Sequence, residues 1–204
     1  MDVGNPLASL APSLDLKVLA ALARSTRVQG VTEIALHVDA SRPGVRGALE
    51  RLAAHGLVEV ITVGRTRGYR LNREHVLTSA ILVALDAPSR IRARIREHVN
   101  GWQLEPYKVI LFGSVARGEG GSESDVDLLV LYGDPSLPDQ DGWSEQLLAL
   151  TSAVHDWTGN DCEIVALSTG QWRSMRAAGE SLVLDVERDG VVLWEAGMRD
   201  SGAA

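Results

Sequence analysis

The sequence predicts an α+β protein with two domains, one small and basic and the other larger and acidic. Net charge first indicates the division, because residues 1–77 carry a net charge of +3 and residues 78–204 carry −10. The spacing of hydrophobic residues supports the same division. It predicts helices and one hairpin in the first part, and buried strands that alternate with helices in the second. A length of 204 residues accommodates two domains of roughly 100 residues each.

Composition and charge exclude several classes of protein. Hydrophobic residues make up 45% and charged residues 23% of the chain, as in globular proteins rather than disordered, collagen-like or coiled-coil chains. No apolar run approaches the roughly 20 residues of a membrane-spanning helix, and the first residues lack the basic start of a secretory signal. The single cysteine, Cys162, excludes an intramolecular disulfide and a multi-cysteine zinc site. We therefore expect a cytoplasmic protein with no membrane partner.

Three helices and a hairpin are expected in the basic N-terminal part. Ser13 is a suitable N-cap for a helix over 14–25, and a second helix is expected over 31–39. The third helix, over 41–56, has a serine at its start and a glycine at its end. A strand over 57–63 then leads into a predicted turn, GRTRG at 64–68, and the strand YRLN returns.

This order of elements resembles the winged helix-turn-helix of bacterial repressors of the ArsR and MarR types, over about residues 14–72. On the third helix, Ser41, Arg42 and Arg46 lie opposite the apolar stripe, near the helix end that reaches base edges in a major groove. Arg65 and Arg67 are expected at the hairpin tip, where a wing contacts phosphates or a minor groove. The pattern thus predicts binding to double-stranded DNA, and a module used only for dimerisation or protein contact is the alternative.

The segment 78–100 is predicted to be a helical linker between a helix-turn-helix domain over 1–77 and a second domain over 101–204. The sequence APS interrupts the helical pattern there and places the domain boundary near Ala87. The basic helix that follows buries Ile91 and Ile95 and carries an arginine run. These arginines either contact nucleic acid or form a solvated helix face, and the second interpretation is favoured. The run comprises Arg90, Arg92, Arg94 and Arg96.

Residues 107–131 carry the motif with the clearest chemistry, YKVILFGSVARGEGGSESDVDLLVL. A buried strand ends at a Gly-Ser pair, a short helical turn and a loop rich in glycine and serine follow, and a second strand begins at Asp125. Because alternate residues of a strand point to one side, Asp125 and Asp127 project together. Two carboxylates on one face can bind hard divalent cations, whereas strand-edge acids without a metal are the plainer alternative.

The motif resembles the nucleotidyltransferase superfamily built on the DNA polymerase β palm, and the resemblance covers about residues 107–195. The variant FGSVARGE…SDVDLLV is similar to minimal nucleotidyltransferases of bacteria and archaea and to the core of aminoglycoside nucleotidyltransferases. The resemblance implies an α/β catalytic domain in which Asp125 and Asp127 are catalytic and hold Mg²⁺, with two ions expected. It also implies that Gly113, Ser114 and Arg117 bind the phosphates of ATP. For Arg117, a salt bridge to nearby acids is the alternative.

A third carboxylate is expected on the strand DCEIVAL, because the polymerase-β-like family uses one on a neighbouring strand. Glu163 is the catalytic candidate, and Asp161, two residues earlier on the same face, is its rival. The family commonly has Asp here, so Glu163 is a departure from its pattern. Cys162 alternates with Glu163 and is expected in the core. Trp172 and Trp194 are expected to pack in the core or at a domain interface.

The combined prediction is an enzyme that uses Mg²⁺ to transfer a nucleoside monophosphate, AMP from ATP, to a hydroxyl acceptor. Minimal nucleotidyltransferases of this kind often act as antitoxins that modify a HEPN-type ribonuclease, so the resemblance implies a protein acceptor such as a toxin. Winged helices of this type commonly act as dimers, which makes a homodimer the expectation by analogy. The alternative is a nucleotide-sensing transcriptional regulator with little or no turnover, and a third interpretation is a non-enzymatic interaction module.

Overall fold

The computed structural model describes residues 1–64 and 66–197, and it divides into two compact units. The N-terminal unit comprises Asp2 and Gly4–Ala87, and the C-terminal unit comprises Met1, Val3 and the chain from Pro88 onward. The predicted mixture of helices and sheets is confirmed. Among the described residues, no helix is both long enough and apolar enough to cross a membrane.

Helices and one hairpin make up the N-terminal unit, in the predicted order. The Ser13 hydroxyl accepts a hydrogen bond from the Leu16 amide, and the Ser41 hydroxyl accepts one from the Gly44 amide, so both predicted N-caps are present. Gly56 follows the third helix with a φ of +76°, a conformation that suits glycine. The elements are η1 (Pro6–Ser9), α1 (Leu14–Ala23), α2 (Val31–His37), α3 (Arg42–Ala54), β1 (Val58–Val63), β2 (Thr66–Leu71) and α4 (Thr78–Leu85).

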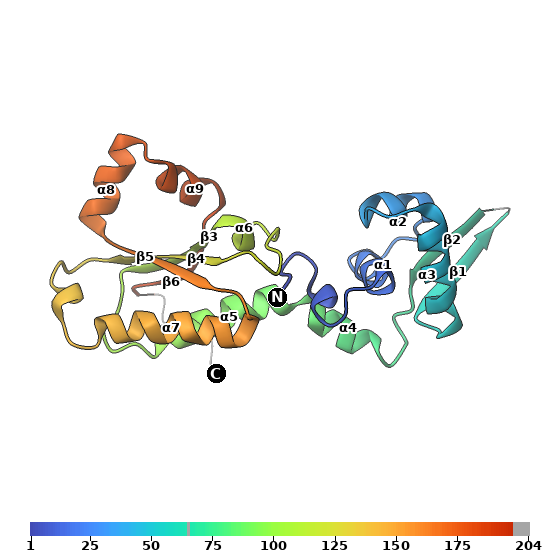
Figure 1. Cartoon of the computed structure of the whole chain (residues 1–204), viewed down its shortest axis with the longest axis horizontal. Coiled ribbons are helices and arrows are strands. Elements are labelled where there is room, and N and C mark those ends of the chain that lie inside the picture. Colours follow the sequence, from blue (N-terminus) through green and yellow to red (C-terminus); the bar gives the residue numbers. More distant parts are fainter. Residues whose placement is uncertain (65, 198–204) are drawn as a thin grey trace. The chain divides into compact units, whose positions relative to one another are not determined.

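The helices of this unit share one apolar core with the base of the hairpin. Leu22, Ile34, Val45 and Leu49 from α1, α2 and α3 are each no more than 1% exposed, and Ile81 of α4 joins them. β1 and β2 pair antiparallel and extend away from α3 (Figure 1). The arrangement is a winged helix-turn-helix, with α3 in the position of the recognition helix and the hairpin as the wing.

The turn of the hairpin is shorter than the sequence predicts. β2 already includes Arg67 and Gly68, so the predicted turn over 64–68 is wrong and Arg67 is not at the tip. Pairing these residues with β1 makes ladder hydrogen bonds that a five-residue turn would leave unmade. Gly68 serves close packing instead, because a side chain there would collide with Val28. Arg65 lies outside the described residues.

A four-stranded mixed sheet organises the C-terminal unit. Its strand order is β5-β4-β3-β6, in which β3 is antiparallel to both neighbours and β4 is parallel to β5. The parallel pair brings the starts of β4 and β5 to the same end of the sheet, where the predicted acids lie. The elements are α5 (Ala87–Asn100), β3 (Lys108–Phe112), α6 (Gly113–Ala116), β4 (Val126–Tyr132), η2 (Leu137–Asp139), α7 (Trp143–Thr158), β5 (Cys162–Ser168), α8 (Thr169–Ala178), α9 (Ser181–Asp189) and β6 (Val191–Glu195).

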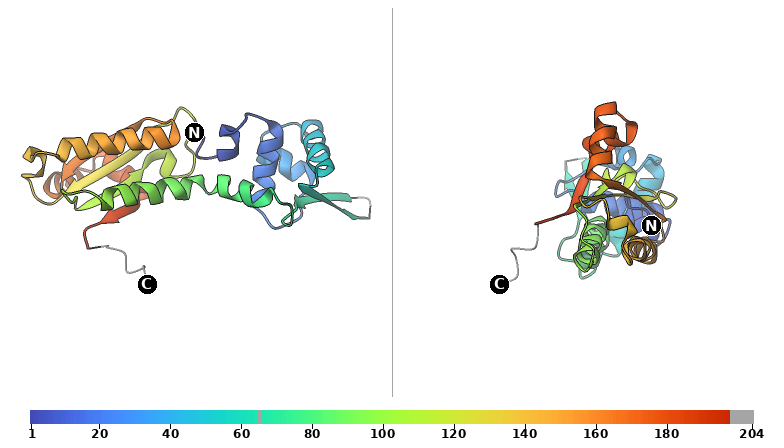
Figure 2. Two further views of the ribbon diagram at one scale, coloured as in Figure 1. Left: turned by 90° about the horizontal axis from the view of Figure 1, so that it is seen from below. Right: turned by 90° about the vertical axis from the view of Figure 1, so that its left-hand side faces the viewer.

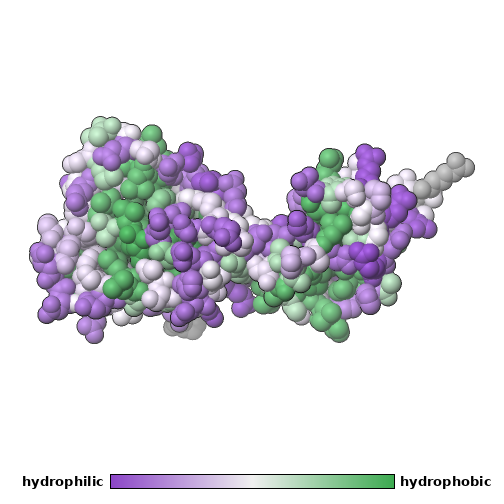
Figure 3. Space-filling model, in the orientation of Figure 1, coloured by the Kyte–Doolittle hydropathy of each residue, from purple (hydrophilic) through white to green (hydrophobic). Residues whose placement is uncertain are grey.

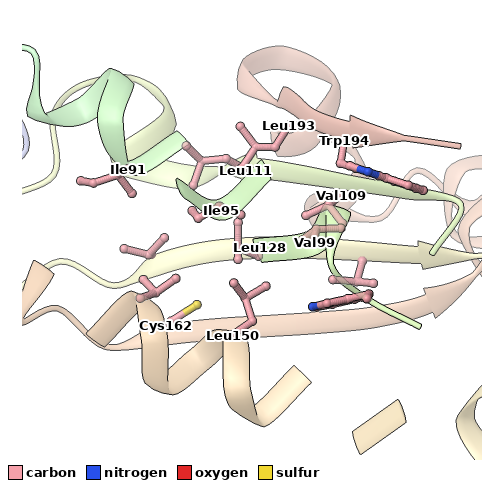
Figure 4. Close-up of a cluster of buried hydrophobic side chains, with 14 of the residues drawn as sticks. Ile91, Ile95, Val99, Val109, Leu111, Leu128, Leu150, Cys162, Leu193 and Trp194 are labelled. Atoms are coloured by element: carbon pink, nitrogen blue, oxygen red, sulfur yellow. The ribbon is translucent and has the colours of Figure 1, made fainter. Parts of the chain in front are cut away.

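Helices cover both faces of this sheet. α5 and α7 lie side by side on one face, and α8 and α9 lie on the other (Figures 1 and 2). The larger core fills the space between the sheet and α5 and α7, where Ile95, Leu111, Leu128 and Leu150 are fully buried (Figure 4). Cys162 is buried in the same core, as predicted.

The opposite face of the sheet carries a smaller apolar cluster that α8 and α9 cover. Ile110, Leu129 and Leu131 are buried in this cluster, and Trp172 packs against it partly buried. Trp194 is 4% exposed in the larger core, so both tryptophans pack in apolar surroundings. In the view of Figure 3, apolar residues form a band across the C-terminal unit.

The segment predicted to be a linker contains α4 and α5, which fall in different units. α4 belongs to the N-terminal unit, and all of α5 except its first residue belongs to the C-terminal unit. The arginines of α5 are partly used for packing: Arg92 donates to the carbonyl oxygen of Ala116 (3.2 Å), and Arg96 donates to that of Leu193 (2.9 Å). The Arg94 guanidinium lies over a tryptophan ring of α7, 5.6 Å from its centroid.

Candidate active site and DNA-binding surface

Asp127 lies on the face of the sheet that carries α6 and α9. Its neighbours in β4, Val126 and Leu128, are fully buried in the larger core, so strand alternation turns Asp127 to the opposite face. The strand register places Asp127 directly opposite Phe112 of β3 and Glu163 of β5. The carboxylates of Asp127 and Glu163 therefore lie at the end of the sheet where β3 ends and β4 and β5 begin.

Gly113 follows β3 immediately and lies against Asp127. Its φ of +73° is a left-handed conformation that residues with a side chain adopt only with strain. A Cβ atom on Gly113 would also collide with Oδ2 of Asp127. The carboxylate occupies the space beside the bare backbone, so both conformation and packing require glycine here. Ser114 is the next residue of α6 and is partly buried.

Negative charge accumulates around Asp127. Burial, followed by the negative charges of Glu163 and Asp125, raises the pKa of the Asp127 carboxyl, and the positive charge of Arg117 opposes this shift. The three carboxylates thus repel one another at the starts of β4 and β5. Hard divalent cations such as Mg²⁺ prefer oxygen donors, and a bound cation would replace this repulsion with attraction.

The donor chemistry fits Mg²⁺, although the carboxylates do not converge on one shared position. Among the residues that the structure describes, no group of three or more His, Cys, Asp or Glu side chains is placed to hold a metal ion. Asp125 is exposed and precedes the first residue of β4, so its side chain can change rotamer without disturbing the core. The backbones of Asp127 and Glu163 are fixed because both residues belong to the sheet, and of the three side chains only that of Asp127 is partly buried.

Glu163 and Asp161, the two candidates for the third carboxylate, have different surroundings. Glu163 is the register partner of Asp127. The side chain of Asp161 is 82% exposed, and its Oδ1 lies 3.3 Å from Nδ1 of His155 on α7. The carbonyl oxygen of Asp161 accepts a hydrogen bond from the Val126 amide at 2.8 Å. The structure therefore brings Glu163, and not Asp161, beside Asp127.

Arg117 is paired with two carboxylates, which is the salt-bridge arrangement that the sequence left as an alternative. Its Nε donates to Oε2 of Glu119 at 2.8 Å, and its Nη1 donates to Oδ2 of Asp189 at 3.0 Å. Asp189 is at the end of α9, 72 residues further along the chain, so no local spacing could indicate it. Hydrogen bonds from Arg188 and Arg117 hold the pKa of Asp189 below its usual value.

The described arginines predicted to bind DNA lie on the exposed surfaces of α3 and β2. Arg42 and Arg46 are exposed on α3, and Arg67 is exposed on β2. Arg46 and Arg67 line the same hollow together with Glu50, so the recognition helix and the wing contribute to one charged surface with more arginines than acids. The Ser41 hydroxyl caps α3 and therefore already has a structural role.

Three other described arginines of this unit are paired with acids, and one of them is Arg27, whose Nη2 lies 2.9 Å from Oε1 of Glu33. Arg51 of α3 contacts Asp15 of α1 with both Nε and Nη2, the latter at 2.6 Å. Arg70 of β2 contacts Glu59 of β1 at 2.7 Å. These ion pairs occupy the guanidinium groups of the arginines concerned, so fewer arginines are available to a polyanion than the sequence of the unit contains.

Two domain families match separate parts of the chain. Residues 16–61 match the IclR helix-turn-helix domain, and residues 89–161 match the nucleotidyltransferase domain. The chain joins a helix-turn-helix domain to a nucleotidyltransferase domain. The nucleotidyltransferase match includes Gly113, Asp125 and Asp127. The helix-turn-helix match is to the IclR type, whereas the sequence resemblance pointed to the ArsR and MarR types.

Three solved structures match parts of this chain at low sequence identity and low TM-score. A toxin–antitoxin structure with AMP-PNP is 23% identical, with 52% of this chain and 74% of that chain covered and a TM-score of 0.36. A candidate nucleotidyltransferase from Sulfolobus solfataricus is 18% identical, with 56% and 88% covered and a TM-score of 0.33. TrmBL2, an archaeal chromatin protein, is 13% identical, with 92% and 78% covered and a TM-score of 0.32. A search of curated proteins gave no match.

Proposed function

We propose that the nucleotidyltransferase domain transfers AMP from ATP to a hydroxyl acceptor and releases pyrophosphate. The observation that supports this proposal is the register that sets Asp127 beside Glu163 and against Gly113. This arrangement lies within a domain that matches the nucleotidyltransferase family. The bare backbone of Gly113 lets Asp127 lie against the end of β3, next to the proposed reacting centre.

Each side chain has a distinct role in this proposal. Asp125 and Asp127 hold Mg²⁺, which when bound neutralises triphosphate charge and lowers the pKa of the acceptor hydroxyl. Ser114 binds the phosphates, and Arg117 joins it by exchanging its ion pairs with Glu119 and Asp189 for the phosphates. Glu163 accepts the proton of the acceptor hydroxyl. The acceptor oxygen forms a bond to the α-phosphorus. The bond from that phosphorus to the oxygen bridging to the β-phosphate breaks, and pyrophosphate leaves with the electron pair.

The proposal includes a protein acceptor, such as a toxin, because the motif FGSVARGE…SDVDLLV resembles that of antitoxins that modify a protein. ATP labelled at the α-phosphate, Mg²⁺ and cell lysate are incubated with the purified protein. We expect label on a macromolecule together with release of pyrophosphate. Omission of Mg²⁺ and use of ATP labelled at the γ-phosphate are the controls. ATP binding without label transfer would instead favour a nucleotide-sensing regulator.

The helix-turn-helix domain is proposed to bind double-stranded DNA through Arg42, Arg46 and Arg67. Log affinity falls as log salt concentration rises, and each lost phosphate contact should reduce the steepness of this fall by about one. Arg67→Ala should therefore flatten the slope, and Arg46→Ala should weaken specific sites more than random ones if it reads bases. Fluorescence anisotropy with labelled DNA across a range of salt concentrations measures both effects.

A matched control for the DNA experiment is available on α3 itself. Arg51 is paired with Asp15, so Arg51→Ala should leave the salt slope unchanged while lowering stability slightly. If the affinity of the unmodified protein does not depend on salt, and a genomic selection enriches no sequence, then the winged helix-turn-helix does not serve DNA binding.

A further inference from the structure

Asn160 lies in the short connection between α7 and β5 and is only 2% exposed (Figure 1). Gly159, with a φ of +70°, ends α7 directly before it, and β5 begins two residues after it. A buried polar side chain must have its hydrogen bonds satisfied inside the protein, because an unsatisfied one costs about 1–3 kcal/mol. The partners of this amide therefore indicate what it does.

The carboxamide of Asn160 is directed at the loop that precedes Asp125. Its Nδ2 lies within hydrogen-bonding distance of three carbonyl oxygens of that loop: Gly121 at 3.2 Å, Ser122 at 3.3 Å and Ser124 at 2.8 Å. Its Oδ1 accepts a hydrogen bond from the amino nitrogen of Met1. All of these partners are at least 36 residues away along the chain, so the amide joins distant segments.

Two hydrogen bonds close a turn within the loop where Asn160 contacts it: the Ser124 amide donates to the carbonyl oxygen of Gly121 (3.2 Å), and the Gly121 amide donates to the Ser124 hydroxyl (3.0 Å). The Asn160 side chain ties this turn to the connection before β5. Three residues of the loop are glycines, which lose more backbone freedom on ordering than any other residue. The parallel ladder between β4 and β5 begins at Val126 and Cys162, and the Val126 amide also donates to the carbonyl oxygen of Asp161. The contact of Asn160 with Ser124 therefore continues the joining of the two segments past the end of the ladder, up to the residue before Asp125.

We propose that Asn160 is a positioning residue that fixes Asp125 relative to Glu163. Glu163 follows Asn160 by three residues on the same segment, and Asp125 directly follows the loop residue that Asn160 binds at 2.8 Å. The amide thus sets the spacing between the backbone segments that carry these two exposed acids. This inference rests on the proposed function, because there Asp125 helps to hold the divalent cation and Glu163 accepts the proton of the acceptor hydroxyl.

The experiment compares Asn160→Ala with Thr158→Val. Thr158 is buried at the end of α7, where its hydroxyl donates to the carbonyl oxygen of Val154 and accepts from the backbone N–H of Asn160. Loss of this hydroxyl weakens the connection between α7 and β5 without removing the contacts of the Asn160 side chain with the loop. Asn160→Asp keeps the size of the side chain and loses the donor, and it serves if the alanine variant does not fold. Amide hydrogen exchange of residues 121–126 and titration with Mn²⁺ alone, followed by its spin resonance signal, are measured on the full chain.

Asn160→Ala is expected to speed exchange across residues 121–126 and to weaken Mn²⁺ binding about tenfold, the lower end of the effect of removing groups that orient metal ligands. Thr158→Val is expected to change neither measurement by more than about twofold. Unchanged Mn²⁺ affinity in Asn160→Ala, or equal effects in both variants, overturns the inference. If the unmodified protein binds no Mn²⁺, the proposed function fails, whereas unchanged exchange in Asn160→Ala contradicts the positioning role alone.

Discussion

Asp127→Asn is expected to abolish Mg²⁺-dependent transfer, with a loss of about a thousandfold or more. Metal coordination contributes several kcal/mol to stabilising charge in the transition state, and each 1.36 kcal/mol corresponds to a factor of about ten in rate. Asp127 is the acid that the sheet fixes, between Glu163 and the backbone of Gly113. Single-turnover transfer of labelled nucleotide at saturating Mg²⁺ measures the effect. A transfer rate within about threefold of that of the unmodified protein would show that Asp127 takes no part in the reaction.

The same variant is expected to be at least as stable as the unmodified protein at neutral pH. The pKa of Asp127 is raised in the folded state, so its charged form opposes folding. This destabilisation is absent below the unfolded-state pKa and grows as the pH rises through the folded-state pKa. The thermal unfolding temperature of Asp127→Asn should therefore be higher than that of the unmodified protein at pH 7 without Mg²⁺. This difference in unfolding temperature should vanish well below pH 3.8, the usual pKa of the group.

Glu163→Gln is expected to slow transfer by about a hundredfold while leaving ATP affinity largely unchanged, since loss of general acid–base help typically costs that much or more. Glutamine preserves the size and the strand position of the side chain and removes its ability to accept the acceptor proton. Single-turnover rates and the binding of a non-hydrolysable ATP analogue, measured side by side, separate the two effects.

Asp161→Asn is the matched control for this experiment. Asp161 is two residues away from Glu163, but its side chain is directed toward His155 and solvent. The single-turnover transfer rate of Asp161→Asn should therefore differ from that of the unmodified protein by less than about threefold. A larger loss from Asp161→Asn than from Glu163→Gln would assign the role to Asp161. No loss from either variant would favour a nucleotide sensor.

The local parts of the candidate site could be predicted from the sequence. Gly113, Asp125 and Asp127 lie within one stretch that reads as strand, turn, loop and strand, so their alternation and order follow from local geometry. The capping serines Ser13 and Ser41 could be identified for the same reason, because a cap depends on residues only three positions away. The roles of the acids in catalysis stay predictions.

The non-local parts could not be predicted. The family resemblance favoured Glu163 over Asp161, but strand alternation puts both on one face, and their different surroundings follow only from the parallel register and the contact with His155. The pairing of Arg117 with Asp189 depends on where α9 packs, which no periodicity encodes. The hairpin turn was misplaced because a Gly-rich stretch is typical of turns, whereas Gly68 is required by the nearness of Val28.

The burial of Cys162 has a practical consequence for studying this protein in solution. Burial, with a smaller contribution from the neighbouring acids, raises the pKa of the Cys162 thiol to about 12, so little thiolate forms at neutral pH. Because the chain has no other cysteine, a cysteine introduced on an exposed position of β2 would be the one thiol that maleimide reagents modify readily. Fluorophores and spin labels could therefore be attached at a chosen position of the wing without first removing the native cysteine.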